Sequence, residues 1–234
     1  MSRPQAAANF TPSMLAVKVK PNKMEDQPNH LYLNAKNGLY LTNMVVDGIF
    51  TRDDKSLAFT EATTTNVLFS PINGTEDNVL KSFKLIDDFT KDFVQQEKDQ
   101  IFKDGDGLEN YTFKPTMAEY NEGAMVHQQV AMSIRLQPIG IYPETSVFHY
   151  ENATSNKPTK KPNGIRELRR ADKVMITFRP TLIYFTADKY GVSYSVDRAL
   201  LMNEDDHNPE ANSDDAFCDF AGEEIANPKK QRVQ

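Results

Sequence analysis

The chain has 234 residues, of which 39% are hydrophobic, with a mean hydropathy of -0.59 and a formal net charge of -6. This length suits one large β-rich or mixed domain with polar segments, or two small domains. The single cysteine, Cys218, excludes an internal disulfide and indicates a reducing, intracellular compartment. No apolar run approaches the roughly 18–20 residues of a membrane-spanning helix, so we expect no membrane partner.

The negative charge is concentrated at the C-terminal end of the chain. Residues 1–202 contain 24 basic and 24 acidic side chains, whereas residues 203–226 contain nine acidic and no Lys or Arg side chains. A polar, acidic segment with few apolar residues buries too little surface to fold. We therefore expect a folded domain at 1–202 and a disordered acidic tail at 203–234, with a short basic end.

The first part of the chain shows several short stretches in which apolar and polar residues alternate. This pattern predicts strands at 14–20, 31–35, 39–46 and 66–69, because successive strand side chains point to opposite faces. Asn37-Gly38 lies between two of these stretches. An Asn-Gly pair between apolar runs predicts a β-hairpin.

Residues 75–102 follow a helical pattern instead. Val79, Phe83 and Ile86 recur at helical spacing, and Thr75 is placed to cap the N-terminus of one substantial helix. A long alternating strand is expected next, at 124–136.

The stretch 171–202 predicts two long β-strands around which the rest of the chain is organised. The first strand contains Pro180, which marks a bulge or an edge position because proline cannot donate a hydrogen bond to a neighbouring strand. Residues 189–191 are expected to form the turn, with Gly191 free to adopt a positive φ. In the second strand, Val192, Tyr194 and Val196 share one face.

The sequence contains no recognisable catalytic or metal-binding motif. The histidines at 30, 127, 149 and 207 have no metal-ligand spacing, and one cysteine cannot build a zinc site. The glycine-rich phosphate loops and the nucleophile-elbow motif are absent. We therefore predict a protein that is not an enzyme and that needs neither a metal nor a cofactor.

Residues 157–179 form a strongly basic segment, with eight basic side chains against two acidic ones. Basic groups that follow phosphates, next to aromatic rings that stack on bases, are what single-strand binding requires. Alternatively, most of the nearby aromatic residues belong to the core, and the arginines form a solvated helix face. The candidate phosphate contacts are Lys160, Lys161, Arg166, Arg169, Arg170, Lys173 and Arg179, and the candidates for a base-stacking floor are Arg135, Tyr150, Tyr184 and Tyr194.

The late strand pair, V-x-I-x-F-x-P…K-Y-G-V-S-Y-S-V, and the acidic tail with its phenylalanines resemble the OB-fold single-stranded-DNA-binding proteins of tailed phages and large DNA viruses. This resemblance, specific mainly over 172–220, implies a mainly β fold: an OB-like five-stranded barrel with additional strands and one packed helix. It implies sequence-independent binding of single-stranded DNA in replication, recombination or repair. It also implies a tail that competes for the DNA groove and docks replication proteins through Asp214, Asp215, Phe217, Asp219 and Phe220.

The chain departs from this family at its end, where Lys229-Lys230-Gln231-Arg232 follows Pro228 in place of acids and an aromatic residue. Such a basic cluster resembles a short nuclear-import signal, which would direct a viral protein to the nucleus rather than the cytoplasm of its host. The alternative from another class is a non-catalytic viral structural protein, a minor capsid or scaffold component of jelly-roll type. A jelly roll needs eight strands in two sheets.

Overall fold

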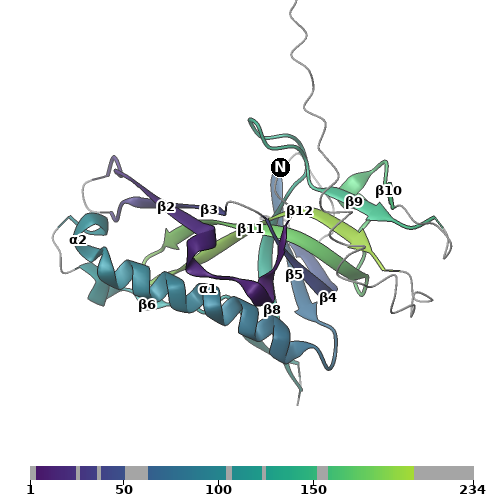
Figure 1. The fold of residues 1–234 in the computed structure, drawn as a ribbon, viewed down its shortest axis with the longest axis horizontal. Helices are drawn as coiled ribbons and strands as arrows, with labels where there is room; N and C mark the ends of the chain where they lie inside the picture. The colour runs from purple at the N-terminus through teal and green to yellow at the C-terminus, as the bar shows by residue number, and fades with distance from the viewer. Residues whose placement is uncertain are drawn as a thin grey trace, which may run out of the picture.

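The computed structural model describes residues 4–24, 27–35, 38–50, 63–103, 107–122, 125–151 and 158–202 (Figure 1). The acidic tail, its expected docking residues and its basic end lie outside the described residues. In the described part of the chain, no helix is both long and apolar enough to cross a membrane.

The structure is mainly β with one main helix, as predicted. The helices are α1 (Glu76–Gln96) and α2 (Lys98–Ile101), with short 3₁₀ helices at Ala7–Asn9, Pro12–Met14, Gly107–Asn110 and Gly164–Glu167. The strands are β1 (Gln5–Ala6), β2 (Leu15–Lys20), β3 (His30–Ala35), β4 (Leu39–Phe50), β5 (Thr64–Pro71), β6 (Thr112–Phe113), β7 (Ala118–Glu122), β8 (Met125–Arg135), β9 (Ser146–His149), β10 (Thr159–Lys160), β11 (Lys173–Phe185) and β12 (Lys189–Leu201).

Five strands close a ring. β4 pairs with β5, β5 with β8, β8 with β12, β12 with β11, and β11 again with β4. These pairs are antiparallel except β8–β12, which is parallel and is joined in the described residues through the single pair Ser133 and Ser195. The ring is therefore weakest between β8 and β12, and the two strands diverge there.

The late strand pair is confirmed, with a shifted turn. β11 and β12 run antiparallel, and the register changes between Pro180 and Leu182, as expected of a bulge at the proline. The backbone N–H of Thr186 donates to the carbonyl of Lys189 at 2.8 Å, so residues 186–188 form the turn. Gly191 already lies in β12 and does not have a positive φ.

The hairpin predicted at Asn37-Gly38 is wrong. β3 pairs with β2, and β4 pairs with β5. Both β3 and β4 also contact β11, β4 along residues 173–178 and β3 at residues 182–183. Since β12 occupies the other edge of β11, β3 and β4 follow one another along the same edge and do not pair with each other. Residues 36–37 themselves lie outside the described residues.

Helix α1 buries its apolar face against the inner side of the ring. Val79, Phe83 and Ile86 are at most 3% exposed, and the Phe83 ring lies 5.8 Å from the ring of Phe178 and 5.5 Å from that of Tyr194. The predicted cap differs in detail, because the Thr75 hydroxyl donates to the carbonyl of Ile72 and makes no capping hydrogen bond to the helix. In Figure 1, α1 crosses below β2, β3 and β11, and β9 and β10 lie at the end of the molecule opposite to α2.

Candidate nucleic-acid interface

The outer face of β8 and β12 is polar because side chains alternate along both strands. Val130, Met132 and Ile134 of β8 and Val192, Tyr194 and Val196 of β12 belong to the core. The residues between them therefore face outward. These outward-facing residues are Ala131, Ser133 and Arg135 on β8 and Ser193, Ser195 and Asp197 on β12.

A groove opens where β8 and β12 diverge. Its volume is about 340 Å³, and it is lined by Gln129 and Ser133 of β8, Ser193 of β12, Tyr184 of β11 and Lys114. Residues 114–118 cross this groove, from a backbone hydrogen bond to Tyr190 at one end to the pairing of Ala118 with Gln129 at the other. Apart from one lysine, the named lining groups are neutral amides, hydroxyls and an aromatic ring.

Tyr184 projects into this groove over a glycine. It lies opposite Gly191, and a Cβ atom added at Gly191 would come within 2.8 Å of the Tyr184 hydroxyl oxygen. The phenol end of Tyr184 thus occupies space that only glycine leaves open. Burial raises the pKa of Tyr184 above its usual value, and the negative charge of Asp87 adds to this, so the hydroxyl stays protonated at neutral pH.

The segment that crosses the groove is tied to α1 by a buried carboxylate. Thr116 donates to Asp87 through its backbone N–H at 2.9 Å and through its hydroxyl at 2.5 Å. With its single proton used in this way, the Thr116 hydroxyl accepts from the Tyr194 hydroxyl at 2.8 Å. Burial is the main cause that raises the pKa of Asp87. Tyr194 is only 2% exposed, so its ring belongs to the core and is not a stacking platform; this corrects the expectation for that residue.

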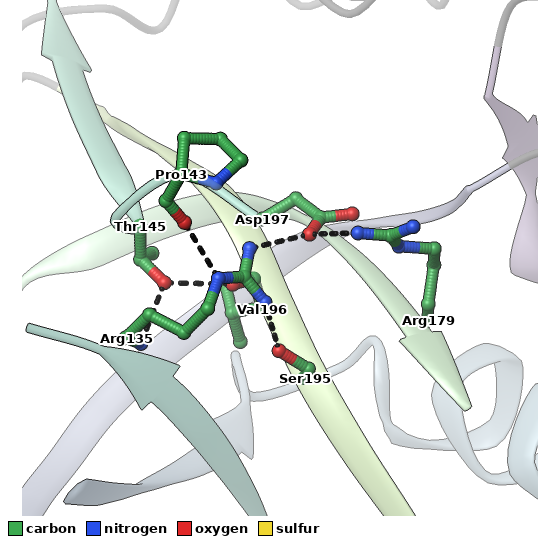
Figure 2. Close-up of polar contacts among 7 residues, drawn as sticks. All are labelled: Arg135, Pro143, Thr145, Arg179, Ser195, Val196 and Asp197. Atoms are coloured by element: carbon green, nitrogen blue, oxygen red, sulfur yellow. Dashed lines mark hydrogen bonds and ion pairs between the residues drawn. The ribbon is translucent and has the colours of Figure 1, made fainter. Parts of the chain in front are cut away.

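Next to the groove, two arginines share one carboxylate oxygen (Figure 2). Asp197 Oδ1 accepts from Arg135 at 2.8 Å and from Arg179 at 2.7 Å. Two guanidinium groups against one carboxylate leave a net charge of about +1 on this cluster. Burial alone would lower the pKa of Arg179, but the hydrogen bond and the charge of Asp197 outweigh it and raise that pKa.

The two arginines differ in what they are free to do. Arg135 is 7% exposed and also donates to the Pro143 carbonyl and to the Ser195 hydroxyl, both at 2.6 Å. We assign it a structural role, which corrects the expectation that it contributes to a base-stacking floor. The side chain of Arg179 is 30% exposed, and its buried Nε has no hydrogen-bond partner among the described residues. Arg179 is therefore the member of the pair that presents positive charge at the surface.

An exposed tyrosine lies over the two guanidinium groups. Tyr142 is 46% exposed, and its ring centre lies 5.3 Å from the guanidinium carbon of Arg179 and 5.8 Å from that of Arg135. Its loop connects β8 to β9 and is held by Thr145, which accepts from the Arg135 backbone N–H and donates to the Val196 carbonyl. Tyr142 is one of the aromatic residues near the basic segment in the sequence, but neither it nor Lys114 was selected as a contact residue. The position of Tyr142 between two prolines and two residues after a glycine is typical of an exposed loop.

The remaining basic candidates lie around β10 and the start of β11. Lys160 pairs with Glu144 and Lys161 with Glu167, each at 3.3 Å. The other members of this group are exposed or half-buried: Arg166, Arg169, Arg170 and Lys173. Tyr150 is half-buried and packs against the small cluster of Tyr40, Met175 and Leu200.

Along β11, Lys173, Arg179 and Tyr184 follow one another over 11 residue steps, which span about 36 Å. The structure thus arranges these three candidates in one line, with the Arg179 cluster between the basic group and the groove. Within the described residues, no group of three or more His, Cys, Asp or Glu side chains could hold a metal ion.

No known protein family matches the chain, and no curated protein matches its sequence. Its structure is similar to that of the single-stranded DNA-binding protein from bacteriophage Enc34 in complex with ssDNA. The two chains are 12% identical, with a TM-score of 0.42, and the similarity covers 81% of this chain and 98% of the phage chain.

Proposed function

We propose that the chain binds single-stranded DNA without sequence preference, on the outer face of β8, β11 and β12. The observation that carries this proposal is the exposed Tyr142 ring over the Arg179 guanidinium, beside a groove that contains a second aromatic ring, Tyr184. Arginine donates to phosphate oxygens in a fixed geometry, and an aromatic ring stacks on any base. Because every base has a face that can stack, binding through Tyr142 and Tyr184 needs no particular sequence.

The ring of strands supports an OB-like barrel as the fold behind this function. An OB barrel is five-stranded, partly open and of Greek-key order, and it binds oligonucleotides on the face of its second and third strands. Here the ring has five strands, β12 lies between β8 and β11 out of chain order, and closure is weakest at Ser133 and Ser195. The second and third ring strands, β5 and β8, both line the groove.

The other parts of the proposal follow from charge. Lys114 and Arg179 would contact phosphates at and beside the groove, and Lys173 with the basic group around β10 would extend this path at one end. The acidic tail at 203–234 would compete for the same surface or dock replication proteins, beside a folded domain at 1–202. Such a protein would act in replication, recombination or repair inside a reducing compartment, without a catalytic group or a cofactor.

Fluorescence anisotropy with a labelled oligo-dT at two salt concentrations tests the proposal. Binding should weaken with salt, with a log–log slope of about -0.7 per phosphate contact. Replacing Arg169, Arg170 and Lys173 together with alanine should weaken binding and make this slope shallower by about 2. Lys81→Ala, an exposed lysine on α1, is the matched control and should change neither quantity.

The competing function is a viral structural protein of jelly-roll type. The described strands form one connected sheet that closes on itself, an arrangement unlike the two packed sheets of a jelly roll. Absence of oligo-dT binding even near 50 mM salt, where counterion release favours binding most, would nevertheless favour that alternative.

A further inference from the structure

Strands β2 and β3 extend the outer face of the ring beyond β11. Ser193 of β12 lies opposite Leu182 of β11, Leu182 lies opposite Tyr32 of β3, and Tyr32 lies opposite Lys18 of β2. Side chains of directly opposed residues lie on the same face of a sheet. Because Ser193 lines the groove, the groove and the outer face of β2 and β3 belong to one continuous surface.

This extension carries an aromatic ring between lysines. Tyr32 is 42% exposed, and the Lys20 ammonium nitrogen lies 4.7 Å from the centre of its ring. The exposed His30 ring, directly opposite Lys20 in the strand register, lies 6.2 Å from the Tyr32 ring. Neither β2 nor β3 contains an acidic residue, so this face offers only positive and neutral groups.

The side chains on the inner face of β2 and β3 anchor both strands to the core. Leu15, Leu31 and Leu33 are buried in the main core, and Val17 and Val19 pack against it. Tyr32 and the two lysines point away from this core, so they are not needed to hold β2 and β3 in place. An exposed ring on a positively charged sheet face suits an anionic partner with unstacked rings of its own.

We propose that Lys18, Lys20 and Tyr32 form an extension of the single-strand path, which we call the hairpin subsite. A DNA strand that leaves the groove beside Tyr184 and Ser193 would cross β11 onto β3 and β2. There a base would stack on Tyr32, and phosphates would contact the two lysines. β2 lies three strand spacings from β12, about 14 Å, so the subsite would lengthen the path by a few nucleotides. This inference rests on the function proposed above.

An oligonucleotide length series tests the subsite. The measurement is anisotropy with labelled oligo-dT of about 6 and about 20 nucleotides. The shorter lies near the lower end of the roughly 4–16 nucleotides that one OB fold binds, and the longer exceeds that range. Tyr32→Ala should weaken binding of the long oligonucleotide by about 5-fold or more and leave the short one nearly unchanged. Lys18→Ala with Lys20→Ala should make the salt slope for the long oligonucleotide shallower by about 1.4.

Two controls separate stacking from misfolding and from general charge. Tyr32→Phe keeps the ring and should bind the long oligonucleotide as the wild type does, and all variants should keep the wild-type melting temperature because these side chains are exposed. Binding of a DNA duplex should not depend on Tyr32, since its bases are already stacked.

The outcomes distinguish the inference from the proposed function. If the wild-type protein binds oligo-dT and Tyr32→Ala binds both lengths as tightly as the wild type does, the hairpin subsite is overturned and the proposed function stands. Equal losses for duplex and single strand would overturn the stacking role of Tyr32. Failure of the wild-type protein to bind either length would overturn the proposed function, and the subsite with it.

Discussion

Gly191 of β12 and Tyr184 of β11 are directly opposed, and a Cβ atom at position 191 would lie 2.8 Å from the Tyr184 hydroxyl oxygen and 3.0 Å from the carbonyl oxygen of Lys114. The backbone conformation does not demand glycine here, because Gly191 does not have a positive φ. What demands it is the close approach of a side chain and a neighbouring backbone. Gly191 therefore sets where Tyr184 lies in the groove.

We predict that Gly191→Ala displaces Tyr184 and weakens binding of oligo-dT by about 5-fold or more, the effect of one lost stacking contact. Crowding of the added methyl group should also lower the free energy of unfolding by about 1–3 kcal/mol. Anisotropy and urea denaturation measure the two effects. Gly38→Ala is the matched control, because a Cβ atom there would meet nothing closer than 3.8 Å. If Gly191→Ala bound oligo-dT as tightly as the wild type does, Tyr184 would not be part of the binding surface.

The fold was predictable where the signal is local. The alternation in 171–202 and the helical spacing of Val79, Phe83 and Ile86 each depend on one element, and both predictions are confirmed. The Asn37-Gly38 hairpin failed because strand pairing depends on which edges are available. β11 has 13 residues and accommodates β4 and β3 in turn along one edge, which no local pattern reveals.

The candidate site was predictable only in part, for a similar reason. Tyr194 alternates with Val192 and Val196, so its burial was already indicated by the period-two pattern. The hydrogen bonds that Asp197 accepts from Arg135 and Arg179 join β8 to the β11–β12 strand pair, which follows much later in the chain. No spacing rule in a single sequence links residues 135, 179 and 197, so their different roles emerged only from the structure.

Arg135 and Arg179 should respond differently to the same substitution, although they contact the same oxygen. Arg135→Ala removes the donor to the Ser195 hydroxyl and to the Pro143 carbonyl, although Arg179 remains on Asp197, so we expect a loss of about 1–3 kcal/mol in the free energy of unfolding. Arg179→Ala should cost less stability, because Arg179 is more exposed than Arg135 and Arg135 still donates to Asp197. It should instead weaken oligo-dT binding and make the salt slope shallower by about 0.7.

Urea denaturation and anisotropy at several salt concentrations separate these two roles. Arg179→Lys is an informative third variant, since it keeps the charge and loses the planar group that packs on Tyr142. If both alanine variants lowered stability equally and left DNA affinity unchanged, the cluster would be structural throughout.

The raised pKa of Asp87 predicts how the free energy of unfolding changes with pH. Burial raises its pKa above the ordinary value of 3.8, and the hydrogen bonds from Thr116 oppose this only in part. A carboxyl group with a raised pKa binds its proton more readily in the folded than in the unfolded state. Its cost to stability is therefore fully present above the folded-state pKa and is relieved as the pH falls from that pKa toward 3.8.

Comparison of the wild type with Asp87→Asn in urea denaturation at neutral pH and near pH 4 isolates this effect. The stability of the wild type relative to the variant should rise as the pH falls, because only the wild type gains a proton at this site. The asparagine retains an acceptor for Thr116, so the variant should fold. A relative stability that fell on acidification would mean that the charged form of Asp87 is the one that the fold favours.

The tail prediction rests on two charge blocks of opposite sign. Residues 203–226 contain nine acidic side chains, and residues 157–179 carry an excess of six positive charges. A tethered competitor acts at an effective concentration of the order of mM. Truncation after Asn203 should therefore tighten oligo-dT binding at low salt, and the gain should shrink as salt screens both partners. The melting temperature should hardly change, because a segment with few apolar residues adds little to a core.

Direct competition and long-range repulsion between tail and DNA both predict tighter binding after truncation, so affinity alone does not separate them. Addition of the tail as a free peptide does, because a competitor displaces oligo-dT from the truncated protein whereas repulsion requires the tether. A peptide of the same length and charge with Phe217 and Phe220 replaced by alanine is the matched control. Equal displacement by the two peptides would assign competition to charge alone and leave the phenylalanines for docking of a protein partner. Equal affinity of full-length and truncated protein at low salt would remove the regulatory role altogether.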